Sequence, residues 1–320
     1  MRPFVSIVIP VYNGAATIGR LVEELIGTLG GTYRLEVVLV NDGSRDNSEE
    51  ICRQLHEAHR EIVAFYSLAK NVGEHNAVMA GLNQVGGEYV VIMDDDFQNP
   101  VSEVRKLVEA IRGSDVDVIY TYYEKKQHAW WRNVGSKFND WVATMMLGKP
   151  RDLYLSSFKV MNRFLVREVV KYDQPFPYID GLILRTTSRI GRVAVEHHAR
   201  AHGRSGYTLR KLISLWLNMF TNFSIVPLRV AMVSGSLVAL VGLGIGCYTV
   251  VEKFTNPSLP VGWAMTIVLL TLFSGVQLMA MGMIGEYVGR IFLSQNKKPQ
   301  YVIRAAYPRV EAGEGEHAGG

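Results

Sequence analysis

Two long stretches of this chain carry no charged residue, and they restrict its architecture more than any other feature. They comprise residues 230–251 and 261–285. A helix of about 20 apolar residues crosses the roughly 30 Å hydrocarbon core of a bilayer. The sequence therefore predicts two transmembrane helices, which form a hairpin over residues 229–289.

The charges that flank these stretches predict their orientation. Arginine and lysine residues gather before the first stretch and after the second, whereas the connecting residues 252–260 hold only Lys253 as a cation. Cytoplasmic loops of membrane proteins carry an excess of such residues. We therefore expect a multi-pass protein of a bacterial-type inner (plasma) membrane, with both termini and the remaining domain cytoplasmic. Because these basic residues are concentrated next to the predicted helices, we expect them to contact the lipid bilayer. The net charge of the whole chain is only +4, and no nucleic-acid partner is expected.

Residues 1–206 alternate between apolar, β-rich runs and amphipathic stretches. This alternation predicts an α/β domain in which a mostly parallel sheet has helices on both faces. The predicted strands are residues 5–9, 35–40, 62–68, 89–93 and 116–122, and the predicted helices are residues 15–29, 48–59, 76–84 and 101–112.

Polar residues follow three of the predicted strands, at Pro10–Asn13, Asn41–Ser44 and Asp94–Asp96. In parallel sheets, ligands bind beyond the carboxyl ends of the strands. We therefore expect the three segments to meet in one binding site. A dinucleotide-binding site is excluded because the first turn, PVYNGA, lacks the GxGxxG spacing that lets the backbone approach a pyrophosphate.

Three adjacent carboxylates, Asp94, Asp95 and Asp96, stand at the end of the fourth predicted strand in the segment MDDDFQNP. They repel one another unless solvent or a counter-charge screens them. A solvated turn is one interpretation, which Pro100 favours. A divalent cation that carries an anionic substrate is the other, because Mg²⁺ binds carboxylates together with substrate phosphates.

Four segments resemble family 2 glycosyltransferases of the GT-A fold: VSIVIPVYN, VNDGSRDNS, KNVGEHNAVMAG and MDDDFQNP, in this order. The two uncharged stretches, with GEYVGRIF closing the second, resemble the polyprenyl-phosphate branch of that family. This branch includes dolichyl-phosphate mannose synthases, bacterial undecaprenyl-phosphate glucosyltransferases and aminoarabinose transferases. The resemblance covers about residues 4–303.

The resemblance implies a nucleotide-sugar donor and Mg²⁺ or Mn²⁺ as cofactor. Asp96 and Gln98 would contact the metal, and Asp94 would hold the donor sugar or the reacting centre. Asp95 occupies the variable middle position, where it contacts the donor or faces solvent.

Further donor contacts are implied in the first loops of the domain. They are Pro10, Tyr12, Asn13, Asp42, Gly43, Asn71 and His75. Asp42 would bind the base while Asp46 or Ser48 caps the following helix. His75 is either a donor contact or a structural residue. Gly14 departs from the family pattern, which commonly has glutamate at this position.

Cations would stabilise the departing nucleoside diphosphate and bind the lipid phosphate. The resemblance implies Arg132 and Arg200 as catalytic residues. The acceptor phosphate would be bound by Lys159, Arg200, Arg204 and Ser205, the last three of which lie in RAHGRSGY, a segment that resembles the family's RxxGxSKY loop. Where the family has a further arginine this chain has Tyr122, and Lys125 or Lys126 either replaces it or lies in a solvated loop.

Two segments complete the predicted organisation. Residues 207–228 have apolar side chains at helical spacing, which favours an amphipathic helix in the membrane interface, although a core helix has the same pattern. Residues 290–320 form a cytoplasmic tail. The resemblance also implies a homo-oligomer, which is a tetramer among relatives.

The expected function is transfer of one sugar, with inversion, from a nucleotide-sugar to polyprenyl (undecaprenyl) phosphate at the cytoplasmic membrane face. The donor is expected to be linked to UDP rather than to GDP. One alternative is a processive polysaccharide synthase, but such enzymes need a QxxRW motif and more membrane spans than this chain has. The other is a non-catalytic, membrane-anchored binding protein. It is favoured by the departures at Gly14, at Tyr122 and at Gly206, which stands where the family's RxxGxSKY loop has lysine.

Overall fold

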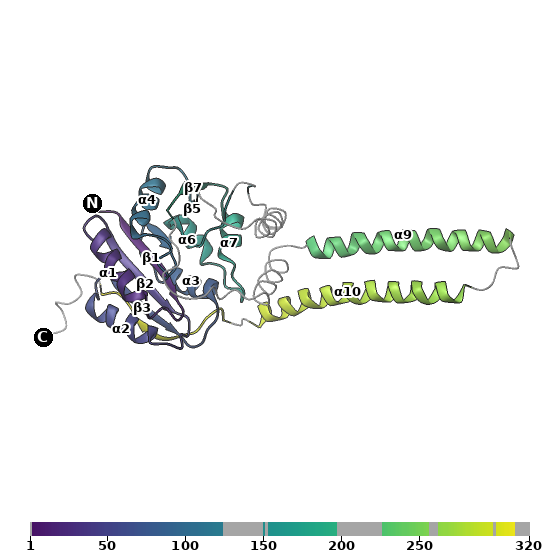
Figure 1. Ribbon diagram of the computed structural model, residues 1–320, viewed down its shortest axis with the longest axis horizontal. Helices are drawn as coiled ribbons and strands as arrows, with labels where there is room; N and C mark the ends of the chain where they lie inside the picture. Colours follow the sequence, from purple (N-terminus) through teal and green to yellow (C-terminus); the bar gives the residue numbers. More distant parts are fainter. Residues whose placement is uncertain are drawn as a thin grey trace. The chain divides into compact units, whose positions relative to one another are not determined.

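The computed structural model describes residues 2–123, 150, 153–196, 226–255, 262–296 and 299–310 (Figure 1). The chain divides into two compact units. The first consists of Met1–Gly206 together with Pro299–Gly320, and the second consists of Tyr207–Lys298.

The first unit is built on a sheet whose strands and helices alternate along the chain. Its elements are β1 (Phe4–Val11), α1 (Ile18–Leu29), β2 (Arg34–Asn41), α2 (Ser48–Ala58), β3 (Val63–Leu68), α3 (Glu74–Leu82), β4 (Tyr89–Ile92), α4 (Val101–Arg112), β5 (Val118–Tyr122), β6 (Lys159–Asn162), α6 (Arg163–Val169), α7 (Ile179–Thr186), β7 (Ile190–Ala194) and β8 (Ile303–Tyr307). The nine elements from β1 to β5 confirm the predicted alternation, with bounds that differ by a few residues.

The sheet has eight strands in the order β7-β5-β6-β4-β1-β2-β3-β8. Strand β1 pairs in parallel with β2 and β4, β2 with β3, and β5 with β7. Strand β6 is antiparallel to both of its neighbours, and β8 is antiparallel to β3. The sheet is therefore mostly parallel, and the carboxyl ends of β1, β2 and β4 lie at one edge.

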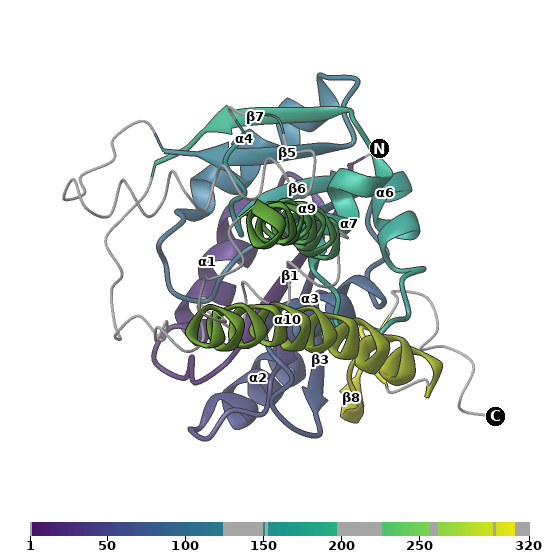
Figure 2. The same ribbon diagram turned by 90° about the vertical axis from the view of Figure 1, so that its right-hand side faces the viewer.

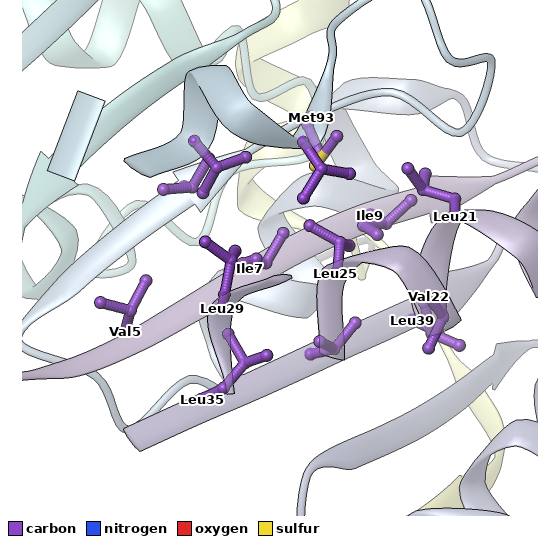
Figure 3. Close-up of a cluster of buried hydrophobic side chains, with 14 of the residues drawn as sticks. Val5, Ile7, Ile9, Leu21, Val22, Leu25, Leu29, Leu35, Leu39 and Met93 are labelled. Atoms are coloured by element: carbon purple, nitrogen blue, oxygen red, sulfur yellow. The ribbon is translucent and has the colours of Figure 1, made fainter. Parts of the chain in front are cut away.

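Helices cover both faces of the central strands, which is the usual condition of a parallel sheet. On one face, Leu21, Leu25 and Leu29 of α1 recur every fourth residue and pack against Ile7 and Ile9 of β1 (Figure 3). This spacing puts the apolar side chains of a helix on one side. On the other face, helix α3 lies close to β1: a Cβ atom added to Gly81 would be 2.5 Å from the Val8 side chain, so glycine permits this close packing.

Strand β8 was not predicted, and it belongs to the first unit although it follows the second unit in the chain. The Tyr307 ring stacks on Phe65 of β3, with 5.6 Å between ring centroids. Beyond the strand, Arg309 Nε lies 3.4 Å from the buried Glu36 carboxylate, and its guanidinium lies over the Phe4 ring. Residues from both ends of the chain thus stabilise the same sheet.

The second unit contains two long helices, α9 (Val226–Thr255) and α10 (Trp263–Gln295). They lie side by side (Figures 1 and 2). A Cβ atom on Gly242 would lie 2.7 Å from the Phe273 ring, so glycine permits this approach. Pro227 is in the first turn of α9, where the backbone N–H that proline lacks is not needed. Searched over its described residues, the structure has no helix that is both long and apolar enough to cross a membrane.

Replacing Tyr307 tests the contribution of β8. We expect Tyr307→Ala to reduce the free energy of unfolding by roughly 2–3 kcal/mol, because it removes a half-buried stacked ring. The exposed Arg304 on the same strand provides the control, Arg304→Ala. Thermal unfolding of the purified full chain in detergent measures both variants, and equal midpoints would contradict a stabilising role for β8.

Candidate active site

The loops after β1 and β2 are joined by side-chain to backbone hydrogen bonds. Asn13, whose φ of 55° is in the left-handed region, accepts a bond from Arg45 N to its Oδ1 at 2.8 Å. Its own N–H donates to Ser44 Oγ at 3.0 Å. Ala15 N donates to Asp46 Oδ2 at 3.1 Å. The two predicted donor segments therefore meet at the sheet edge.

Asp42 connects the loop after β2 to the loop before α3. Its buried carboxylate accepts bonds from Val72 N at 2.7 Å and from Gly73 N at 3.0 Å. Burial raises the pKa of Asp42, and these two N–H groups oppose the rise. Its predicted contact with a base stays a prediction, since both carboxylate oxygens already accept backbone hydrogen bonds.

Gly43 and Asn71 strengthen the same junction. The Asn71 side chain donates to Asp42 O at 3.0 Å. Gly43 has a φ of 63°, and a Cβ atom there would lie 2.6 Å from Asn71 N. Both the backbone conformation and the lack of space require glycine at this position. The predicted donor residues Asp42, Gly43 and Asn71 are thus brought together.

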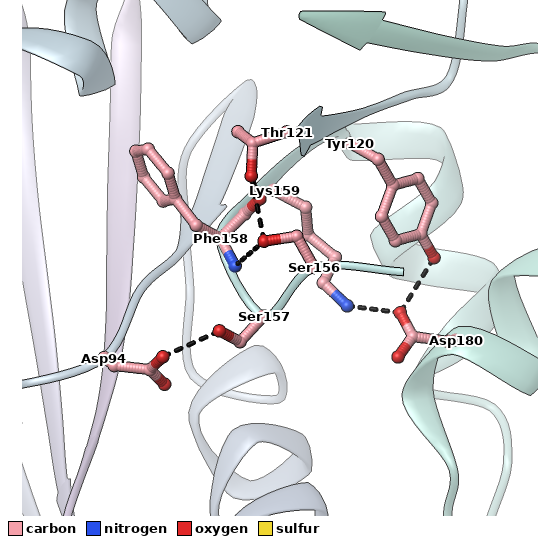
Figure 4. Close-up of polar contacts among 8 residues, drawn as sticks. All are labelled: Asp94, Tyr120, Thr121, Ser156, Ser157, Phe158, Lys159 and Asp180. Carbon is pink, nitrogen blue, oxygen red and sulfur yellow. Dashed lines mark hydrogen bonds and ion pairs between the residues drawn. The ribbon is translucent and has the colours of Figure 1, made fainter. Parts of the chain in front are cut away.

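The three carboxylates after β4 have three different neighbours. Asp94 Oδ2 accepts a 2.6 Å hydrogen bond from Ser157 Oγ (Figure 4). Asp95 Oδ2 is buried and lies where a side chain on Gly14 would begin. Asp96 Oδ1 accepts a bond from Gln98 N at 3.1 Å. The expectation that Asp95 faces solvent is therefore wrong for Oδ2, because the β1–α1 loop covers it.

Two further contacts hold this loop on either side. The Phe97 ring, at a residue with φ of 59°, lies 5.3 Å from the Arg20 guanidinium of α1. The buried Asn99 accepts a bond from Tyr123 OH at 3.2 Å. The segment MDDDFQNP is therefore a fixed connection between β4 and α4, whose conformation depends on residues distant in sequence.

Lys159 begins β6 and is buried beside the site. Its Nζ forms an ion pair with Asp180 Oδ1, which also accepts a 2.8 Å bond from Tyr120 OH (Figure 4). The ammonium lies 5.0 Å from the centre of the Tyr120 ring. Its assignment to the acceptor phosphate stays a prediction, and such a role would require Lys159 to leave or share Asp180.

The turn that carries Ser157 is ordered by its neighbours. Thr121 Oγ1 donates to Phe158 O at 2.8 Å and lies 2.9 Å from Ser156 Oγ. Phe158 N donates to Ser156 Oγ at 3.2 Å. Sequence analysis missed Ser156 and Ser157 as well as Asp180. Only Asp180 has a sequence signal, a single acidic residue within the apolar segment YIDGLIL.

Comparison with known proteins identifies the family. Residues 6–170, more than half of the chain, match the family described as Glycosyl transferase family 2. The chain belongs to this family of glycosyltransferases. It is therefore an enzyme of the transferase class, and the resemblance found in its motifs is confirmed.

Relatives match this glycosyltransferase over nearly its full length. It is 33% identical over 317 residues to a protein of Edwardsiella ictaluri (strain 93-146) named undecaprenyl-phosphate 4-deoxy-4-formamido-L-arabinose transferase, with 96% of this chain and 97% of that protein covered. A protein of the same name from Serratia proteamaculans (strain 568) is 32% identical over 303 residues, covering 94% of this chain and 93% of the relative.

A solved structure confirms the GT-A α/β fold of this glycosyltransferase. Glucosyl-3-phosphoglycerate synthase from Mycobacterium tuberculosis, crystallised with uridine-diphosphate, superimposes with a TM-score of 0.50 at 18% identity. The match covers 68% of this chain and 79% of that chain. At this identity the likeness shows the fold alone.

Glu74 and His75 at the start of α3 have displaced pKa values. The Glu74 side chain is partly exposed to solvent. Loss of hydration from the surrounding protein is the largest cause that raises its pKa to about 7, and the nearby Asp94 carboxylate is the second. Burial lowers the pKa of His75 to about 4. Its ring meets Tyr178 edge-on at 5.1 Å. The glycosyltransferase therefore holds a neutral imidazole here, and a contact between His75 and the donor stays a prediction.

Several predicted residues of this glycosyltransferase lie outside the described residues. They are Arg132, Arg200, Arg204 and Ser205, together with Lys125 and Lys126 and most of the predicted interface helix, residues 207–225. Their roles stay predictions. Pro10 and Tyr12 are described at the end of β1, where the Tyr12 side chain is exposed.

The described residues contain no group of three or more His, Cys, Asp or Glu residues arranged to hold a metal ion. Asp96 and Gln98 nevertheless come from one tight turn, in which Asp96 Oδ1 accepts the Gln98 N–H. Carboxylate and amide oxygens are ligand types that hard divalent cations prefer, and Mg²⁺ commonly takes its other ligands from substrate phosphates and water. The donor set thus fits a cation that arrives with a diphosphate.

Breaking the buried ion pair is expected to destabilise the glycosyltransferase. Asp180→Ala leaves the Lys159 ammonium buried without its carboxylate, which costs roughly 3–5 kcal/mol. The double variant Lys159→Met/Asp180→Leu should recover most of this loss. Thermal unfolding in detergent measures the effect against Asp173→Ala at an exposed site, and a midpoint for Asp180→Ala equal to that control would contradict it.

The raised pKa of Glu74 predicts a pH dependence of stability. The pKa of Glu74 is about 7 in the folded state and 4.5 ordinarily, so the folded state binds the proton more tightly than the unfolded state does. The stability that Glu74 contributes is therefore fully present below pH 4.5 and is lost as the pH rises through 7. Glu74→Gln should therefore lose less stability than wild type between pH 5 and pH 8. Unfolding midpoints across this range, with the exposed Glu88→Gln as control, measure it, and parallel profiles would contradict it.

Proposed function

We propose that this glycosyltransferase moves one sugar from a nucleotide-sugar, with UDP as the expected nucleotide, to the phosphate of a polyprenyl lipid such as undecaprenyl phosphate. The observation that carries the proposal is the match over 96% of this chain to a relative named undecaprenyl-phosphate 4-deoxy-4-formamido-L-arabinose transferase. That match includes both long helices as well as the α/β unit. The M. tuberculosis synthase with the same fold was crystallised with Mn²⁺ and uridine-diphosphate, which supports the choice of ligands to test.

The proposed reaction is a displacement at the anomeric carbon. A phosphate oxygen of the lipid forms the new bond to this carbon while its bond to the UDP oxygen breaks, so the configuration inverts. Because a phosphate monoester is substantially ionised near neutral pH, the acceptor requires little help from a base. Asp94, which Ser157 holds at 2.6 Å, would orient the reacting groups.

Asp96 and Gln98 would hold the divalent cation. When bound, Mg²⁺ or Mn²⁺ neutralises charge that develops on the departing diphosphate. Pro10, Tyr12, Asn13 and Asp42 would face the nucleotide from the neighbouring loops. Arg132 and Arg200 are proposed to stabilise the leaving group, and Arg200, Arg204 and Ser205 to receive the lipid phosphate.

The long helices α9 and α10 are proposed to form a membrane hairpin, with the catalytic unit on the cytoplasmic side. Two observations support the proposal: residues 230–251 and 261–285 carry no charged residue, and large apolar side chains on both helices are exposed, among them Leu240 at 65% and Leu278 at 69%. Lipid acyl chains around the helices would remove these apolar side chains from water, which is favourable. A homo-oligomer would cover part of them as well.

Release of nucleoside diphosphate by the purified full chain in detergent tests the proposal. Donors would be a panel of UDP- and GDP-sugars that includes UDP-4-deoxy-4-formamido-L-arabinose. We expect release that requires both undecaprenyl phosphate and a divalent cation. No release with any donor, although UDP binds, would favour the non-catalytic alternative.

Asp96→Asn is expected to lower this activity by roughly 100-fold, because neutralisation of the leaving group is weakened. The matched control is Asp115→Asn, at a surface carboxylate whose side chain is 91% exposed and pairs with Arg189. Steady-state rates at saturating donor and metal measure both variants. An Asp96→Asn enzyme with full, metal-dependent activity would contradict the metal assignment.

A further inference from the structure

Gly14 and Asp95 compete for the same space in the site. A Cβ atom built on Gly14 would lie 2.0 Å from Asp95 Oδ2 and 2.9 Å from Asp95 Cγ. Neither distance occurs between real, non-bonded atoms. A side chain at position 14 would therefore require the Asp95 carboxylate, which is the end of a rotatable side chain, to turn away from its place. The φ of Gly14 is not in the left-handed region, so the backbone makes no separate demand for glycine.

The conflict is confined to the end of the Asp95 side chain. The third nearest atom to the added Cβ is Val11 Cγ1, at 3.3 Å, so Asp95 Cβ is no closer than this. Removing Cγ and the carboxylate oxygens, as in Asp95→Ala, would therefore leave room for a Cβ atom at position 14. Val11 would need to shift by only a few tenths of an ångström.

The contact joins the two loops that the sequence assigns to the donor and to the cation. Gly14 follows Asn13, whose conformation is fixed by bonds to Ser44 and Arg45. Asp95 lies in a loop that also packs on α1 through Phe97 and Arg20. A change at either member of the pair therefore reaches the nucleotide side of the site through the β1–α1 loop.

We infer that Gly14 and Asp95 act as a matched pair, in which the Asp95 carboxylate occupies the space that a side chain at position 14 would take and thereby positions the β1–α1 loop for the nucleotide. The middle carboxylate of MDDDFQNP is then a positioning residue. The part of this inference that concerns the nucleotide rests on the proposed function, whereas the pairing rests on geometry alone.

A four-protein cycle in the full chain tests the pair: wild type, Gly14→Glu, Asp95→Ala and the double variant. Thermal midpoints and Kd for UDP with Mn²⁺ are measured in detergent. Gly14→Glu should lower the midpoint and weaken UDP binding by about tenfold or more, because it forces two carboxylates together. The double variant should return the midpoint to near wild type and Kd to within about threefold.

Asp95→Asn separates charge from shape. It keeps the size of the side chain and removes its charge, so a pairing based on shape predicts a midpoint and a Kd for UDP close to those of wild type. Asp115→Asn serves as the surface control in both measurements.

Two results would overturn the pairing: a Gly14→Glu protein that melts and binds UDP like wild type, or a double variant no better than Gly14→Glu. A Kd for UDP about tenfold weaker in Asp95→Asn, with an unchanged midpoint, would overturn the pairing by shape, because the charge would then carry the effect. If the wild-type enzyme releases no UDP with any lipid acceptor, the proposed reaction is refuted. Recovery of the midpoint in the double variant still decides the pairing in that case.

Discussion

Electrostatic repulsion among the carboxylates that follow β4 is the constraint on which the site depends. Two unit charges 4 Å apart repel by about 4 kcal/mol at an effective dielectric constant of 20. The three carboxylates have different neighbours: the Ser157 hydroxyl donates to Asp94, the Gln98 N–H donates to Asp96, and the Asp95 carboxylate lies against Gly14. One dense charge cluster thereby becomes three separately positioned groups, of which Asp96 is proposed to meet the cation.

The sheet topology makes these neighbours available. Strand β4 lies between β1, whose loop supplies Gly14, and β6, whose preceding turn supplies Ser157. Because β6 runs antiparallel to β4, its start lies beside the carboxyl end of β4, and Lys159 is opposite Ile92. The buried pair between Lys159 and Asp180 then joins this edge to α7. Such a pair adds little net stability over apolar packing, but it tolerates the loss of neither partner.

The sequence predicted the elements whose apolar periodicity is clear, and not the later strands that complete the sheet. The elements from β1 to β5 follow from apolar periodicity. Strand β6 has only four residues, and β8, which follows the long helices in the chain, pairs with β3, a pairing that no periodicity indicates. The site divides in the same way: Asp94, Asp96 and Asp42 were identified from strand ends, whereas Ser157 is 63 residues from Asp94. The burial of Asp95 Oδ2 depends on the lack of a side chain at Gly14, which no strand-end pattern indicates.

Binding of Mn²⁺ in the presence and absence of UDP tests the central claim most directly, because the described residues provide few cation ligands of their own and a diphosphate would supply the others. Free Mn²⁺ is counted by electron paramagnetic resonance in titrations of the wild type and Asp96→Asn. The account predicts one tightly bound Mn²⁺ per chain only when UDP is present, and its loss in Asp96→Asn. Equally tight binding without UDP, or binding unchanged in Asp96→Asn, would contradict it.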